Sequence, residues 1–243
     1  MRGLTDAIKH LIIINVILFA APQFLSSLNL QPILALWFPE NSNFGFWQFV
    51  SHMFMHGSLT HILFNMYALW AFGTPLEQMW GTKKFTFFYF TAGIGAGLIY
   101  TLVNYFQFNQ VYDLLLNNGW MASDIQSLLE TGRANVGVSP EVSQDDLQKI
   151  YGLFNTPAVG ASGAIYGVLV AFGFAFPDAK LAMIFFPVPI AAKYFIPLII
   201  VGDLFFGISG ANTGTAHFAH IGGALIGFLI MKYWQKNQFS RWD

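Results

Sequence analysis

The sequence predicts an all-α polytopic membrane protein that forms one domain of six transmembrane helices. Only 9% of the 243 residues are charged and 55% are hydrophobic, whereas ordinary soluble domains carry roughly 25% charge. Several segments are long and apolar enough to cross a bilayer. The net charge of −1 argues against nucleic-acid binding. The absence of cysteine excludes disulfides, thiolate zinc sites and cysteine nucleophiles.

Runs of about 20 apolar residues define the expected spans. These are about 11–27, 51–73, 85–106, 158–176, 194–209 and 217–234. Segment 28–50, rich in Pro, Asn and aromatic residues, is expected at the membrane interface. Segment 180–193 is expected to form an interfacial hairpin, because its twelve apolar residues are too few to cross and Pro187 and Pro189 interrupt a helix.

Basic residues set the predicted orientation. With the N-terminus in the cytoplasm, nine of the eleven Lys and Arg residues lie on the cytoplasmic side, and only Arg133 and Lys149 lie outside. This bias places both termini in the cytoplasm. The external loop 107–157 then holds six of the twelve acidic residues. Its apolar helical stripes and the Ser143–Asp146 capping box predict short amphipathic helices that rest on the outer leaflet.

Polar residues at bilayer depth are costly, so each needs a reason. The fourth span opens with Gly160-Ala161-Ser162-Gly163, and Tyr166 follows Ser162 on nearly the same helix face. The small residues allow another backbone to approach closely. A purely structural alternative exists for the serine alone, since its hydroxyl also bonds to the backbone one turn back.

The start of the sixth span carries a histidine above a glycine face. His220, Gly223 and Gly227 share one side of the helix, and the two glycines form a GxxxG pair suited to close packing. If this face meets the small-residue face of the fourth span, the imidazole reaches the Ser162 hydroxyl. Removal of its proton by a base makes a serine nucleophilic, and histidine suits that task near neutral pH.

The second span carries His52, His56, His61 and Asn65 within fourteen residues. His61 and Asn65 share a helix face and are able to donate hydrogen bonds to an oxyanion. For His52 and His56, hydrogen bonds between the outer loop and the helix are the simpler interpretation. Their i, i+4 spacing also suits zinc, but we expect neither a metal nor another cofactor.

These three clusters together resemble the rhomboid family of intramembrane serine proteases. The residues that carry the resemblance are Gly160-Ala161-Ser162-Gly163, Ala219-His220-Ile221-Gly222-Gly223 with Gly227, and His56-x4-His61-x3-Asn65. The resemblance spans all six expected helices and implies a six-helix rhomboid-like bundle. It is carried by the combination and order of the motifs, which are far more specific together than any one of them alone.

The resemblance also implies a role for each matching residue. Ser162 is expected to be the nucleophile and His220 the general base, in a dyad without an acidic partner. The oxyanion hole is expected to comprise His61, Asn65 and the backbone N–H of Ser162, while Tyr166 stacks on His220. The supporting residues are expected to be His56, Gly160, Gly163 and Gly223.

Two further positions bear on this likeness, and two other features are read from the residues themselves. Glu77 matches a family glutamate that ties helices together. The family often has Trp-Arg in the first outer loop, where this chain has Trp47-Gln48. Asp203, an acid within the fifth span, is expected to face the bundle, but the sequence assigns it no role. The Gly-rich joint 209–214 is expected to act as a movable lid.

The implied activity is that of a serine endopeptidase, a hydrolase that cleaves peptide bonds in or next to transmembrane helices of membrane-protein substrates. We expect a multi-pass protein in a cell membrane, and the compact chain favours a bacterial cytoplasmic membrane. Two alternatives stay open at this point. One is a catalytically silent protein of the same fold that binds or chaperones membrane helices, and the other is a histidine-lined metal transporter.

Overall fold

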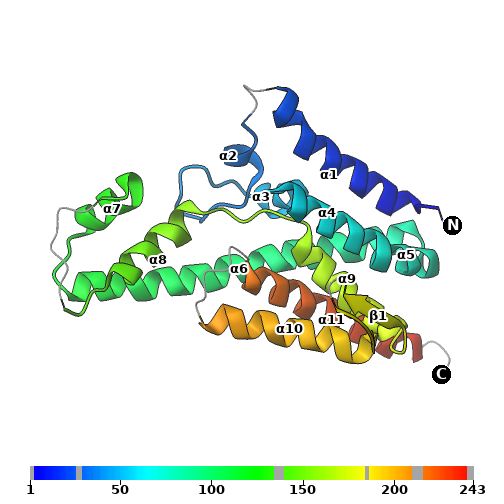
Figure 1. Cartoon of the computed structure of the whole chain (residues 1–243). Helices are drawn as coiled ribbons and strands as arrows, with labels where there is room; N and C mark the ends of the chain where they lie inside the picture. Colours follow the sequence, from blue (N-terminus) through cyan, green and yellow to red (C-terminus); the bar gives the residue numbers. More distant parts are fainter. Residues whose placement is uncertain (1–2, 26–28, 134–139, 184–185, 210–215, 240–243) are drawn as a thin grey trace.

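The computed structural model describes residues 3–25, 29–133, 140–183, 186–209 and 216–239. The described chain is mostly helical, and helical segments occupy the greater part of each predicted span (Figure 1). The helices at the first, third, fourth, fifth and sixth spans are α1 (Asp6–Phe24), α6 (Thr82–Asn117), α9 (Ser162–Ala175), α10 (Ala192–Ser209) and α11 (His217–Phe239). Of the described helices, α1, α6 and α10 are long and apolar enough to cross a membrane. The predicted lid residues 210–214 lie outside the described residues.

The prediction of one continuous helix over 51–73 is wrong. The chain instead forms α3 (Gln48–Ser51), η1 (His52–Phe54), α4 (Leu59–Ala68), the π-helical turn η2 (Leu69–Gly73) and α5 (Thr74–Trp80). The break occurs because Ser58 caps a new helix, its Oγ accepting the His61 N–H at 3.1 Å. The wide turn of η2 precedes Pro75, which has no N–H to donate to the helix.

Helix α9 lies at the centre and packs against α6, α10 and α11. Nine of its fourteen residues are buried, and at about 21 Å it is shorter than a bilayer core of about 30 Å. It begins at Ser162 rather than at 158 as predicted. The reason is that Ala158 pairs with Leu36 through two backbone hydrogen bonds and Gly160 adopts a φ of +127°, which a helix does not allow.

Glycines let α9 and α11 touch backbone to backbone. A Cβ atom on Gly223 would lie 1.8 Å from the carbonyl oxygen of Gly163, and one on Gly227 would lie 2.7 Å from Gly167 Cα. The third side of the crossing is closed by alanines of α6, since a Cβ on Gly163 would lie 2.7 Å from Ala96 Cβ. The two small-residue faces of the sequence therefore meet, as predicted.

The region 107–157 is a small helical layer with its own core. Helix α6 has 36 residues, about 54 Å, and its C-terminal end carries α7 (Ala122–Thr131) and α8 (Gln144–Asn155) (Figure 1). The predicted Ser143–Asp146 capping box opens α8. The apolar stripes face one another rather than lipid, because the buried residues of this cluster are Phe38, Phe108, Val111, Leu115, Trp120, Ile125, Leu128, Leu129, Val142, Leu147 and Ile150.

At the other end of the bundle, the predicted hairpin is present. Strands β1 (Lys180–Met183) and β2 (Phe186–Ala191) pair antiparallel, with Lys180 opposite Ala191. The start of α1 and the end of α11 lie at this same end, opposite α7 (Figure 1). This arrangement is compatible with the predicted orientation. The count of six spans and the cytoplasmic placement of the termini stay predictions.

The buried side chain of Glu77 joins three helices at one end of the bundle. The carboxylate of Glu77 accepts hydrogen bonds from the N–H groups of Ala7 (2.8 Å) and Ile8 (3.1 Å) and from the Thr5 and Thr82 hydroxyls, which ties α1 and α6 to α5.

Gln48 stands where the family often has arginine, and it is fully buried. Its amide nitrogen donates to the Asn43 carbonyl at 2.7 Å, and its amide oxygen accepts the Trp37 N–H at 3.2 Å. It also lies within 3.4 Å of carbonyls in α2 (Gln31–Leu34). A neutral amide at this position therefore forms hydrogen bonds with the loop that precedes α3.

We expect Gly223→Ala to destabilise the bundle. The added methyl has no space beside the Gly163 carbonyl, and overpacking of this kind costs about 3 kcal/mol when backbone must move. The matched control is Gly152→Ala in α8, where a Cβ meets nothing within 4 Å. Thermal unfolding in detergent measures both. A Gly223→Ala variant as stable as Gly152→Ala would contradict the helix contact.

Candidate active site

The glycine crossing of α9 and α11 places a serine beside a histidine. Ser162 is the first residue of α9, and His220 lies in the first turn of α11. Below them, Gly163 and Gly223 hold the two helices in backbone contact. His220 Nε2 lies 2.8 Å from Ser162 Oγ, and His220 is buried. An imidazole in this position is able to accept the serine proton during attack on a carbonyl.

The Tyr166 ring lies flat against His220. The ring centroids are 4.2 Å apart and the planes differ by 12°. The Tyr166 hydroxyl donates a hydrogen bond to a carboxylate oxygen of Asp203. The tyrosine therefore restricts the imidazole from one face and at the same time fixes the neighbouring acid.

The structure departs from the expected dyad because Asp203 lies against the imidazole. Its Oδ1 is 3.2 Å from His220 Nδ1 and 2.5 Å from His217 Nδ1. An ionised carboxylate only accepts hydrogen bonds, so both rings carry a proton on Nδ1. With that tautomer, His220 Nε2 is left to accept the Ser162 hydroxyl proton.

The sequence assigned no role to Asp203, and the expected site did not include His217. The signal was present: Asp203 is the only charged residue within the fifth span, and an acid at that depth needs a partner. The two histidines at i and i+3 at the start of the next helix share a face. The sequence does not show that the two helices place these faces together.

His61 and Asn65 follow each other by one turn of α4. A Cβ on Gly160 would lie 2.9 Å from His61 Nε2 and 3.6 Å from Ser162 Oγ, so the imidazole and the hydroxyl border the same small space. Asn65 is buried, and one of its N–H groups donates to the His61 carbonyl at 2.9 Å. As the first residue of α9, Ser162 also has a backbone N–H without an acceptor inside the helix.

The other two histidines of this region support the site. The His52 ring donates from Nδ1 to the Gln48 carbonyl at 2.7 Å, and its own carbonyl accepts the Gly160 N–H at 2.9 Å. The buried His56 ring meets His61 edge-on, with centroids 4.9 Å apart. His52 therefore secures the loop before Ser162, and His56 packs behind His61.

Among the described residues, one group has the donor set and spacing of a metal site. The ligand atoms of Asp203, His217 and His220 lie within 4.8 Å of one another. A divalent cation there would replace the Nδ1 protons of both rings. The same atoms bond to one another directly, which makes the carboxylate–imidazole contact an alternative use of this donor set.

Known proteins match the chain over most of its length. Residues 43–236 match the Rhomboid domain family. The mitochondrial Rhomboid protein 1 of Saccharomyces cerevisiae is 28% identical over 190 residues, 77% of this chain and 41% of that protein. The mitochondrial presenilin-associated rhomboid-like protein of Rattus norvegicus is 32% identical over 181 residues, 74% of this chain and 36% of that protein.

The rhomboid protease AarA of Providencia stuartii is 27% identical over 196 residues, 76% of this chain and 54% of that protein. The chain thus spans between 36% and 54% of the length of these relatives. Because the family match covers residues 43–236 of 243, the chain belongs to the rhomboid family.

Proposed function

We propose that the chain is an intramembrane serine endopeptidase that hydrolyses peptide bonds in or next to transmembrane helices of other membrane proteins. The observation that supports this most is the 2.8 Å contact between Ser162 Oγ and His220 Nε2, made by groups on two different helices. The relative named a rhomboid protease, 27% identical, adds to this support. The chain requires no cofactor for this reaction.

The first chemical step is acylation. Ser162 Oγ attacks the scissile carbonyl carbon while its proton moves to His220 Nε2. The tetrahedral intermediate collapses, the peptide C–N bond breaks, and His220 returns the proton to the leaving amine. Water then attacks the acyl-enzyme with His220 again as the base, releasing the carboxylate product and free Ser162.

The negative charge of the intermediate needs donors. The Ser162 N–H points from a helix N-terminus, where the helix dipole also favours an anion. His61 lies across the small space beside Gly160, and we assign it and Asn65 as further donors. Three preorganised donors of this kind provide a large part of the rate enhancement in acyl transfer.

The substrate is a transmembrane segment in a lipid bilayer. Its amides are bonded inside its own helix, so it must unwind locally before Ser162 reaches a carbonyl. Segments with glycine or proline near their outer end unwind more readily. We propose the six-span topology with both termini in the cytoplasm, and a cell membrane as the location. The names of two relatives place those proteins in mitochondria, so the relatives do not support a bacterial cytoplasmic membrane over a mitochondrial one.

We expect Ser162→Ala to abolish cleavage of a single-pass reporter without changing thermal stability. The hydroxyl is the attacking group, and alanine at the first position of α9 is a good helix former. A fluorophosphonate probe should label the wild type on Ser162 and not the variant. A wild type that binds reporter helices without labelling or cleavage would instead assign the chain to the silent, helix-binding alternative.

We expect Gly160→Ala to lower kcat about 100-fold, the loss seen when an oxyanion donor is removed. The new methyl would occupy the space between His61 and Ser162, and the φ of +127° disfavours any side chain. Gly57→Ala is the control, because a Cβ there meets nothing within 4 Å. Steady-state cleavage of the reporter compares the two, and equal rates would remove His61 from the oxyanion hole.

A further inference from the structure

We propose that Asp203 is a positioning residue for His220, so that Ser162, His220 and Asp203 act as a triad whose acid is supplied by α10. This inference rests on the proposed serine-protease function and deepens it. It is supported by two successive contacts that share the His220 ring. Ser162 Oγ lies 2.8 Å from His220 Nε2, and His220 Nδ1 lies 3.2 Å from Asp203 Oδ1. The acid, base and hydroxyl come from three helices.

The carboxylate is placed to control the tautomer of the base. A neutral imidazole carries one proton, and only the ring with that proton on Nδ1 offers Nε2 to the serine. Asp203 accepts the Nδ1 proton and therefore selects this tautomer. It also stabilises the positive ring that forms when His220 takes the serine proton, as in other serine hydrolases with an acid behind the histidine.

The surroundings of Asp203 keep it in this position. Its Oδ2 accepts the Tyr166 hydroxyl, and its Oδ1 accepts the His217 ring at 2.5 Å in addition to His220. The side chain is buried. Three donors around one carboxylate compensate for the loss of water at this depth. A buried acid without a function would be a costly residue to keep in a membrane helix.

Helix α10 presents this acid to the bundle from a face that is otherwise largely exposed. Its buried residues are Ala192, Phe195, Ile196 and Asp203. Beyond Asp203, the large apolar residues of α10 are between 41% and 72% exposed, as expected of a surface that faces lipid. Asp203 is the buried polar contact of this half of α10 with α9 and α11, beside the packing of Phe206 on His217 and of Gly207 on Phe218.

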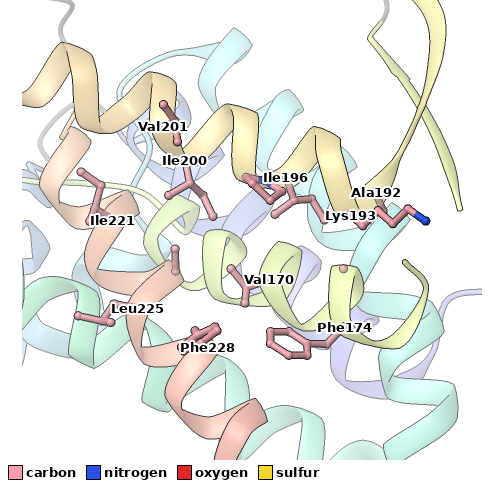
Figure 2. A pocket seen from close by; sticks show the side chains of 13 residues that line it. Val170, Phe174, Ala192, Lys193, Ile196, Ile200, Val201, Ile221, Leu225 and Phe228 are labelled. Atoms are coloured by element: carbon pink, nitrogen blue, oxygen red, sulfur yellow. The ribbon is translucent and has the colours of Figure 1, made fainter. Parts of the chain in front are cut away.

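Nearer its start, α10 packs closely on α9, because a Cβ on Gly173 would lie 3.1 Å from Ile196 Cδ1. A pocket of about 550 Å³ lies between α10, α9 and α11, with Ile200 and Val201 on one side and Ile221 and Leu225 on the other (Figure 2). The pocket walls around Ile200 and Val201 are apolar, so in this stretch α10 is held by packing alone. The position of the acid therefore depends on how α10 packs against α9 and α11.

The test compares three variants by reporter kinetics and by the rate of fluorophosphonate labelling. Asp203→Asn keeps the shape but offers an amide that no longer selects the tautomer, and we expect kcat to fall about 10³- to 10⁴-fold with KM nearly unchanged. Asp203→Ala leaves a cavity beside His220. The matched control is Asp178→Asn, which removes the exposed ion pair that Lys193 of α10 makes at 2.8 Å, and it should retain wild-type rates.

Rescue separates positioning from folding. Formate should restore labelling of Asp203→Ala, because a small carboxylate is able to take the place of the missing one, whereas neutral formamide of the same size should not. A folded Asp203→Ala variant that formate does not rescue overturns the proposal. If that variant does not fold, Asp203→Asn decides: labelling at the wild-type rate, or a loss that lies in KM, overturns it.

Two further outcomes are distinguishable from these. A wild type that is never labelled on Ser162 overturns the proposed function, and this inference with it. A wild type that loses its activity in EDTA and regains it with zinc assigns Asp203, His217 and His220 to a metal site, which also overturns the triad. Normal wild-type labelling together with an unaffected Asp203→Asn overturns the triad alone.

Discussion

Backbone contact between α9 and α11 is the constraint on which the site depends. Ser162 and His220 lie on separate helices, and their separation is fixed by the glycines next to them in each chain segment, Gly163 and Gly223. Side chains at a helix crossing usually keep axes 8–10 Å apart. Removal of those side chains brings the backbones together, so that a serine and a histidine, which have short reach, are able to touch. The short distance between Ser162 Oγ and His220 Nε2 therefore depends on the absence of side chains at the glycines of this interface.

The close contact of the two helices also allows the polar groups inside the apolar bundle to form hydrogen bonds with one another. At low dielectric an unpaired hydroxyl, imidazole or carboxylate is strongly unfavourable, while a paired one is held more firmly than in water. Ser162, His220 and Asp203 satisfy one another in a single line. Tyr166 closes this network from the side, through its ring on His220 and its hydroxyl on the acid.

Local sequence patterns predict much of this fold. The glycine faces, the Ser143–Asp146 cap and the hairpin at 180–193 depend on neighbouring residues, and all three are present. Local patterns do not predict the features that depend on tertiary contact. The stripes at 107–157 look like leaflet-binding surfaces until α6 extends to cover them. Asp203 likewise meets His220 only because α10 lies against α11, a contact that no spacing in the sequence encodes.

For the proposed protease, the placement of the acid on α10 bears on how a substrate would reach Ser162. A transmembrane segment that approaches Ser162 from the lipid would have to pass the helices packed on α9, and α10 is one of these. Near the site, α10 contacts α11 through Asp203, Phe206 and Gly207. In the proposed triad, the acid and the base belong to different helices, so any displacement of α10 relative to α11 would separate Asp203 from His220 and weaken the activation of Ser162.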